Sequence, residues 1–327
     1  MSNFIDDKIG TWEDSEKAME IYLMLDYLEK RLFRTYEVSL PPNPDFWTRC
    51  RQWIANANNK KQLEEKLFKS ITHIFYVGPE EFNELYRSAY NDPIAKWLID
   101  NENIAFTDPC AGEKLKESVK KTWFCPISDS MAINKFYHIN NIPSCVSDVR
   151  PELRALTQFG DESKILDYID KNKIDYIVLL EDFVGSGSQM SNSIQRISFL
   201  VKKVNVKILV VPLIICPKGH NLCKSLSKRL DIEFSPVLPL GDEVFIPKIF
   251  PNDAEPHIKD LSDMAHDTYQ QVSNNIPPGA RKPYGPLGYK NTGGLIVMFT
   301  NTPDNTLPMF HWTSQTWDPI FPRHSRN

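Results

Sequence analysis

Apolar residues along the chain change their spacing near residue 103. Up to that point they recur every three or four positions, which is typical of amphipathic helices. The first two helices are expected after Asp14 or Ser15 and after Asp45, since these residue types are favoured helix caps. Further helices are predicted at 63–75, 79–90 and 94–99. We therefore expect residues 1–103 to form an all-helical module that serves packing or partner binding.

Residues 104–327 show a different pattern, in which short apolar runs alternate with helical segments. Ile174–Leu180 is nearly continuous in apolar side chains, as in a parallel strand covered on both faces. Further strands are expected at 122–126, 204–215 and 231–234. Helices are expected at 114–121, 131–139, 152–159 and 163–171, and after residue 189. This alternation predicts an α/β domain with a doubly wound parallel sheet.

The chain beyond Gly241 is richer in proline, with one predicted helix at 255–272 and a long loop at 279–291. Leu295–Thr300 is apolar enough to be one more strand, which we expect to join the sheet or to pack on its edge. Asn301 and Asn305 would then border a ligand site at the carboxyl end of that strand. The aromatic residues of the tail would cover a nucleobase or, as their large area favours, pack against the N-terminal helices. These residues are Phe310, Trp312, Trp317 and Phe321.

Composition excludes several classes of protein. The 327 residues include 38 Lys and Arg against 42 Asp and Glu, a net charge of -4, so no global basic field is available for direct binding of nucleic acid. The longest apolar run, Ile208–Cys216, spans about nine residues, whereas a membrane helix needs about 20. The first residues lack the pattern of a signal peptide, and we expect a cytoplasmic protein without membrane contact. Cys216 and Cys223 flank His220, but structural zinc needs four ligands, so free thiols are expected.

The most informative segment begins where the strand Ile174–Leu180 is expected to end. Glu181 and Asp182 are followed by a loop of small residues that leads into a helix. Ligands bind α/β sheets at the carboxyl ends of strands, and loop amides at a helix N-terminus form a cradle for phosphate. Two carboxylates would repel a phosphate, so they are expected to face ribose hydroxyls or a divalent cation beside it. The cradle would comprise Gly185, Ser186, Gly187, Ser188 and Gln189. The alternative is an ordinary strand-to-helix turn with exposed acids.

This segment resembles the PRPP-binding motif of type I phosphoribosyltransferases, where a hydrophobic strand precedes two acidic residues, two hydrophobic residues and a short glycine- and hydroxyl-rich loop. The resemblance implies that Glu181 and Asp182 contact the ribose hydroxyls and ribose-bound Mg2+, and that residues 185–189 hold the 5-phosphate. The tail Asn301–Pro308 and the segment Phe82–Leu98 are similar to a phosphoribosyltransferase-like family of bacterial anti-phage systems, including retron operons. This resemblance implies a type I phosphoribosyltransferase-like domain over residues 104–327.

Other candidate residues follow neighbouring strands. Ser128, Asp129 and Ser130 would contact pyrophosphate or cap the helix expected at 131–139. Lys218 and His220 follow the next strand and would neutralise pyrophosphate or form a solvated turn. Alternative diphosphate partners from the loops are Arg281, Lys282, Lys290 and Arg323.

Three functions fit these observations. The first is an enzyme that attacks C1 of magnesium-bound PRPP with loss of pyrophosphate. The second, favoured by departures from the motif at Phe183, Gly185 and Gln189, is a non-catalytic nucleotide sensor or regulatory subunit. The third is a defence effector that depletes nucleotides or modifies nucleic acid. The resemblance also implies a protein partner for the helical module, such as a retron reverse transcriptase complex.

Overall fold

The computed structural model describes residues 8–39, 44–143, 162–251, 255–274 and 284–324. The chain divides into two compact units. Residues 1–79 and 241–327 belong to unit 1, and residues 80–240 belong to unit 2. This division differs from the boundary expected at residue 103. Helices between residues 80 and 103 pack on the sheet of unit 2, and the segment after Gly241 packs with the N-terminal helices.

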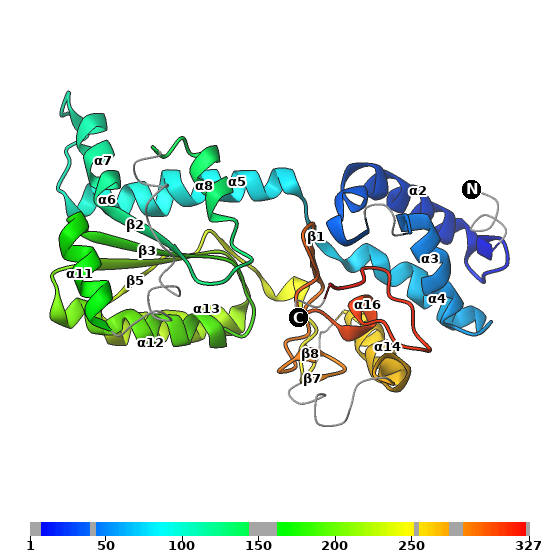
Figure 1. Ribbon diagram of the computed structural model, residues 1–327. Coiled ribbons are helices and arrows are strands. Elements are labelled where there is room, and N and C mark those ends of the chain that lie inside the picture. Colours follow the sequence, from blue (N-terminus) through cyan, green and yellow to red (C-terminus); the bar gives the residue numbers. More distant parts are fainter. Residues whose placement is uncertain (1–7, 40–43, 144–161, 252–254, 275–283, 325–327) are drawn as a thin grey trace. The chain divides into compact units, whose positions relative to one another are not determined.

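Unit 2 contains a parallel five-stranded sheet, as the alternating pattern predicts (Figure 1). Its strand order is β2-β3-β4-β5, and β6 also pairs with β4. The strands are β2 (Thr122–Pro126), β3 (Tyr176–Val184), β4 (Lys207–Ile215), β5 (Glu233–Phe234) and β6 (Leu238–Pro239). All these pairings are parallel, so the carboxyl ends of the strands meet at one edge. β3 continues beyond its predicted end at Leu180 and includes both acidic residues.

Helices cover both faces of this sheet (Figure 1). On one face, α11 (Glu162–Asn172), α12 (Ser188–Lys203) and α13 (Pro217–Leu230) bury apolar side chains against β2, β3 and β4. On the other face, the ring of Phe136 lies 5.6 Å from that of Phe124, and the ring of Trp97 lies 5.4 Å from that of Tyr176. The helices on this face of the sheet are α5 (Pro79–Ala89), α6 (Ala95–Asn101), α7 (Ala111–Lys120) and α8 (Ile133–Ile139). The helix expected at 152–159 lies outside the described residues.

Most helices of unit 1 begin close to where the sequence predicts, but the helix expected at 63–75 ends at Ser70, and Phe75 begins a strand. The helices of this unit are α2 (Ser15–Arg31), α3 (Phe46–Ala55), α4 (Lys61–Ser70), α14 (Pro256–Val272) and the short α16 (Pro308–His311). The Asp14 carboxylate accepts the N–H of Lys17, and that of Asp45 accepts the N–H of Thr48. Both predicted caps are therefore confirmed. Each satisfies a helical N–H group that has no partner within the helix.

The last predicted strand does not join the large sheet. β9 (Ile296–Met298) pairs in parallel with β1 (Phe75–Val77) in a separate two-stranded sheet of unit 1. The only other strands described in unit 1, β7 (Tyr284–Gly285) and β8 (Gly288–Tyr289), form a small antiparallel pair. The predicted strand is confirmed at 296–298, but the expectation that it joins the large sheet was wrong, because apolar character specifies that a strand is buried but not which strand it pairs with.

The aromatic tail packs against the N-terminal part of the chain, as its composition favours. The ring of Trp53 in α3 stacks on Phe310 at 5.5 Å and meets Trp317 edge-on at 5.4 Å. Phe321 contacts Phe33 in the same way at 5.2 Å. Phe310, Trp317 and Phe321 are all fully buried. The tail is thus part of the core of unit 1.

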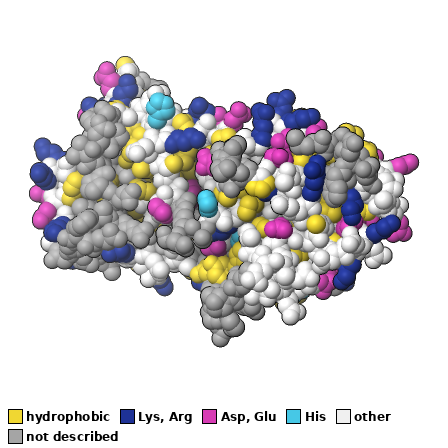
Figure 2. Space-filling model, turned by 45° about the vertical axis from the view of Figure 1, so that its right-hand side comes forward, with side chains coloured by type: hydrophobic (Ala, Val, Ile, Leu, Met, Phe, Trp, Pro, Cys, Tyr) yellow, Lys and Arg dark blue, Asp and Glu magenta, His cyan; other side chains and the backbone are white. Residues whose placement is uncertain are grey.

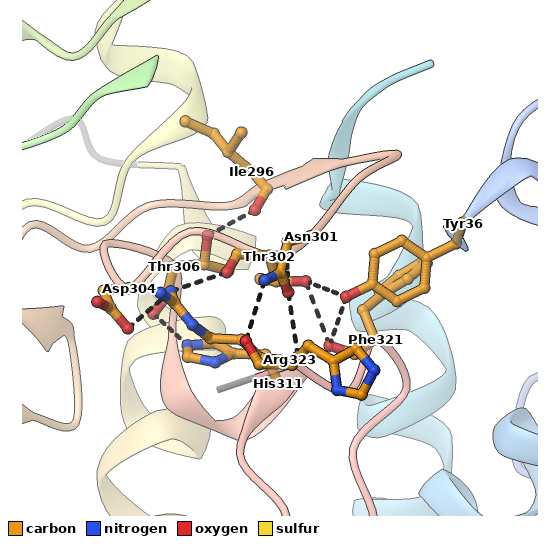
Figure 3. A network of polar contacts seen from close by, with 10 residues as sticks. Tyr36, Ile296, Asn301, Thr302, Asp304, Thr306, His311, Phe321 and Arg323 are labelled. Carbon is orange, nitrogen blue, oxygen red and sulfur yellow. Dashed lines mark hydrogen bonds and ion pairs between the residues drawn. The ribbon is translucent and has the colours of Figure 1, made fainter. Parts of the chain in front are cut away.

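Polar groups hold the same tail in place (Figure 3). The Tyr36 hydroxyl donates to the carbonyl of Pro322 at 2.6 Å and lies 2.9 Å from the Thr302 hydroxyl. The guanidinium of Arg323 donates to the Thr302 carbonyl and pairs with Asp304 at 2.7 Å. Buried Arg49 donates to the carbonyl of Ile320. Backbone carbonyls of the tail are therefore satisfied by side chains from distant parts of the chain.

The described surface mixes both signs of charge. Figure 2 shows Lys and Arg side chains interspersed with Asp and Glu on one face of the molecule. This distribution agrees with the net charge of -4. Among the described helices, none combines the length and apolar character needed to cross a lipid bilayer.

Replacing Trp317 with alanine is expected to destabilise unit 1 by about 3–5 kcal/mol, the usual loss when a buried aromatic side chain is truncated. The indole also donates a hydrogen bond to the Met309 carbonyl, which would lose its partner. Urea unfolding of both proteins measures the difference. Phe106→Ala is the matched control, because Phe106 is 89% exposed. Equal unfolding midpoints for Trp317→Ala and Phe106→Ala would contradict the packing role of the tail.

Candidate functional site

Glu181 and Asp182 lie inside the carboxyl end of β3 rather than in an exposed turn. Both are buried, with 5% and 4% of their surface accessible. Their carboxylates have specific partners: the Ser128 N–H donates to Glu181 at 2.9 Å, and the Ser130 hydroxyl donates to Asp182 at 3.0 Å. The Phe183 N–H also donates to Asp182, at 2.7 Å. The alternative of an ordinary turn with exposed acids is therefore wrong.

The segment after β2 supplies these partners. Ser128, buried, and Ser130, half-buried, lie within hydrogen-bond distance of each other through their hydroxyls, at 2.6 Å, while Asp129 is exposed. They do not cap the following helix, because α8 begins at Ile133 and its N-cap, Ala132, makes no side-chain capping bond. The capping alternative is wrong, and the structure joins these serines to the acidic pair instead.

Burial changes the acidity of the pair. Desolvation, followed by the charge of Asp182, raises the pKa of Glu181 to about 8, although the hydrogen bond from Ser128 acts in the opposite direction. A buried carboxyl next to a second carboxyl favours its neutral form, since that form carries no charge to desolvate. The raised pKa favours retention of a proton by the pair at neutral pH, and a protonated carboxyl group is both a donor and an acceptor.

The glycine loop leads directly into α12. The first helical bond runs from the Ser191 N–H to the Gly187 carbonyl, so the N–H groups that precede it have no partner within the helix. The hydroxyls of Ser186 and Ser188 lie 3.0 Å apart. The loop is buried up to Gly187, whereas Gln189 is exposed. The predicted loop therefore lies at a helix N-terminus, where the helix dipole favours an anion.

Gly219 of α13 packs directly against the backbone of this loop. Gly187 has φ +77°, and a Cβ built on it would lie 3.0 Å from the Cα of Gly219. A Cβ built on Gly219 would lie 2.6 Å from the carbonyl oxygen of Gly185, which is closer than real contacts allow. The loop and α13 thus meet backbone to backbone, and only glycine fits at both positions.

The other basic candidates fall in different places. Lys218 is exposed in the first turn of α13, directly after β4, at the same edge of the sheet as the loop. His220 contacts the ring of Phe234 at 5.5 Å. Lys290 and Arg323 belong to unit 1, where Arg323 holds the tail. Arg281 and Lys282 lie outside the described residues.

Asn301 and Asn305 also belong to unit 1, because β9 does not join the large sheet. The amide of Asn301 donates to the His324 carbonyl at 3.1 Å, and its oxygen accepts the N–H groups of Thr302 and His324. Asn305 donates to the Thr292 hydroxyl at 2.9 Å. Both amides therefore hold loops together within unit 1.

No cluster of three or more His, Cys, Asp or Glu side chains suited to a metal ion occurs among the described residues. Cys216 and Cys223 are both buried and form no disulfide. Glu181 and Asp182 supply two carboxyl groups at the edge of the sheet. They suit a cation that brings most of its ligands with it, rather than one held by the protein alone.

Sequence reasoning missed two residues of this site. Gly219 lies in α13, where a glycine costs about 1 kcal/mol relative to alanine, so its presence in a helix indicates a packing reason. Tyr86 of α5 has no comparable signal. Burial, followed by the charge of Asp182, raises the pKa of Tyr86. Only the fold brings Tyr86 near Asp182, because the two residues are far apart in the chain.

A family model described as PRTase-CE matches residues 50–323 of the chain. This range includes all of unit 2, with the acidic pair and the glycine loop, and most of unit 1. No curated protein and no solved structure matches the chain.

Glu181→Gln is expected to change how stability depends on pH. The folded-state pKa of Glu181 lies above its unfolded value, so folded protein binds more protons between about pH 4.5 and pH 8. Its contribution to stability is therefore present at low pH and is lost as pH rises through this window, by at most about 1.4 kcal/mol per pH unit. The midpoint temperature of thermal unfolding should fall more steeply from pH 5 to 8 for the wild type than for Glu181→Gln. Parallel curves would contradict a protonated Glu181.

Gly219→Ala is expected to displace the glycine loop without touching a bound ligand. The added methyl group would press on the Gly185 carbonyl, and we expect a loss of about 1–3 kcal/mol in folding stability. Gly112→Ala is the control, because Gly112 also lies in a helix and its Cβ would have nothing within 4 Å. Alanine there should stabilise the protein by up to about 1 kcal/mol. If both variants gained stability, the close contact between loop and helix would be disproved.

Proposed function

Because the chain belongs to the PRTase-CE family, a phosphoribosyltransferase-like family, we propose that unit 2 binds PRPP or a related ribose 5-phosphate nucleotide. One observation carries this proposal. Two buried carboxyl groups with defined partners and a glycine loop at a helix N-terminus come from a single stretch of chain at the carboxyl edge of a parallel sheet. This arrangement offers adjacent places for hydroxyl groups and for a phosphate.

The acidic pair suits the ribose hydroxyls. The raised pKa of Glu181 favours its protonated form, in which the carboxyl group can donate to one hydroxyl oxygen. Asp182 is held by Ser130 and by the Phe183 N–H and accepts from a second hydroxyl. With one proton on the pair, the charge that would repel a neighbouring phosphate is reduced. This reconciles acidic residues with a phosphate site.

The loop suits the 5-phosphate. N–H groups at the start of α12, which lie outside the helical hydrogen-bond ladder, and the hydroxyls of Ser186 and Ser188 supply donors, and the helix dipole adds a positive potential. Gln189 is exposed at the first turn, where its amide is accessible to ligand. Lys218, in the first turn of α13, would approach the diphosphate.

Mg2+ would enter with the diphosphate and ribose, since the described residues contain no cluster of three or more His, Cys, Asp or Glu side chains that could hold it alone. When bound, the cation supplies neutralisation of the diphosphate. The two acids would bind and orient the ribose. The loop would hold the phosphate and offset its negative charge. In the transferase reaction a nucleophile would form a bond to C1 of PRPP while the bond from C1 to the pyrophosphate oxygen breaks.

The finer proposal is a type I phosphoribosyltransferase-like domain acting as an effector in a bacterial anti-phage system. The N-terminal helices would contact a protein partner, such as a retron reverse transcriptase complex. A non-catalytic nucleotide sensor would use the same residues without turnover. Incubating the protein with PRPP and Mg2+ and measuring pyrophosphate distinguishes the transferase from the sensor, since a sensor would bind PRPP and release no pyrophosphate.

Asp182→Asn is expected to weaken binding of PRPP and Mg2+ by about 10- to 100-fold, because a charged hydrogen-bond acceptor contributes about 1–3 kcal/mol. Titration calorimetry measures this. The control is Asp175→Asn: Asp175 directly precedes β3, at the opposite end of the strand, and pairs with Lys121 on the surface. It should bind as the wild type does. No binding by the wild type, or equal binding by Asp182→Asn, would refute the proposal.

A further inference from the structure

The exposed face of α2 carries an apolar stripe. Met19, Leu23 and Tyr27 are spaced four residues apart, which places them on one face of the helix, and they are 38%, 61% and 61% exposed. Ala18 and Leu25, on the opposite side, are buried within unit 1. The stripe is therefore not the side by which α2 packs on its own unit. Exposed large apolar side chains that adjoin each other typically mark an interaction surface.

A negatively charged residue lies at one end of the stripe and a positively charged residue at the other. Glu16, Leu23 and Lys30 are seven residues apart, or about two helical turns, so they lie along one line of the helix. Both charged residues are exposed. A negative first turn and a positive last turn complement the helix dipole. The dipole does not account for the apolar side chains between them.

We propose that α2 pairs with the α2 helix of a second copy of this chain, antiparallel, about a two-fold axis through Leu23. The helix runs from Ser15 to Arg31, so Leu23 is its central residue. A two-fold axis there places Leu23 opposite Leu23, Met19 opposite Tyr27, and Glu16 opposite Lys30. The pairing is self-complementary in shape and charge, as a two-fold interface must be. The flanking acids, Glu20 and Asp26, lie on opposite sides of the stripe and do not meet.

The polar and aromatic groups of the proposed interface make exposed contacts within their own helix. Lys30 now pairs with Asp26 within the helix at 2.6 Å, and the guanidinium of Arg31 lies 5.9 Å from the Tyr27 ring. Exposed pairs of this kind contribute little to stability, so exchanging them for contacts across the interface costs little. Two intermolecular Glu16–Lys30 pairs would form, one on each side of the axis.

The size of the helix determines the strength of association. Seventeen residues span about 25 Å, and one helix pair of this length buries less than the roughly 1,200 Å² of a standard interface. The dimer is therefore weak and dependent on concentration. It is also independent of the proposed ligand site, since α2 belongs to unit 1 and the acidic pair belongs to unit 2.

Sedimentation velocity of the full chain from about 5 to 500 μM tests the pairing, a range that covers the dissociation constants of weak, small interfaces. The wild-type sedimentation coefficient should rise from the monomer towards the dimer. Glu16→Lys and Lys30→Glu should each raise the dissociation constant at least about tenfold, because like charges would then face each other. The double variant Glu16→Lys/Lys30→Glu restores opposite charges and should return to within about threefold of the wild type. Circular dichroism checks that α2 remains folded in each variant.

Leu23→Glu should abolish dimerisation, since it places two carboxylates together on the axis. Phe106→Glu is the control, because Phe106 is the same kind of exposed apolar residue but lies in unit 2. A wild type that stays monomeric throughout, or a double variant no better than either single variant, overturns the proposal. Equal loss with Phe106→Glu would show non-specific association through apolar residues and would also overturn it. Retained association in Leu23→Glu would place the interface elsewhere.

Discussion

The candidate site depends on burying two adjacent carboxyl groups at the end of a central strand. Such burial is unfavourable unless a carboxyl group is neutral or well hydrogen-bonded, and here both solutions are used. Ser128 and Ser130 supply donors, and the raised pKa of Glu181 keeps a proton on the pair. The segment after β2 is therefore held against β3 by the site itself. This explains why its serines do not cap α8.

A second constraint is the backbone contact between the glycine loop and α13. Gly187 and Gly219 allow the loop to lie directly against the helix, which closes one side of the candidate phosphate cradle. Since α13 follows β4 at once, the loop after β3 and the turn after β4 form one continuous edge. The position of the loop and the order of the strands are thus linked through two glycines.

Unit 1 is organised by a different principle, the pairing of distant parts of the chain. β1 and β9 pair, the tail aromatics fill the core beside α3, and Tyr36 and Arg49 satisfy carbonyls of the tail. Unit 2 is inserted in the sequence between these two segments. This arrangement uses the inner side of the N-terminal helices for the tail. It leaves the apolar stripe of α2 on the surface.

Local patterns were enough to predict most of the helices, the caps at Asp14 and Asp45, the parallel strands, and the acidic pair with its glycine loop, because spacing and capping act over a few residues. They also predicted the burial of Phe310, Trp317 and Phe321, whereas Trp312, grouped with them, is only half-buried. The partner of β9, the place of Asn301 and Asn305, and the union of 241–327 with the N-terminal helices were decided only by the tertiary structure. The same holds for the raised pKa of Glu181 and for the contact of Gly219 with the loop. Pairing, desolvation and close packing depend on residues distant in the chain, and no local spacing of residues encodes them.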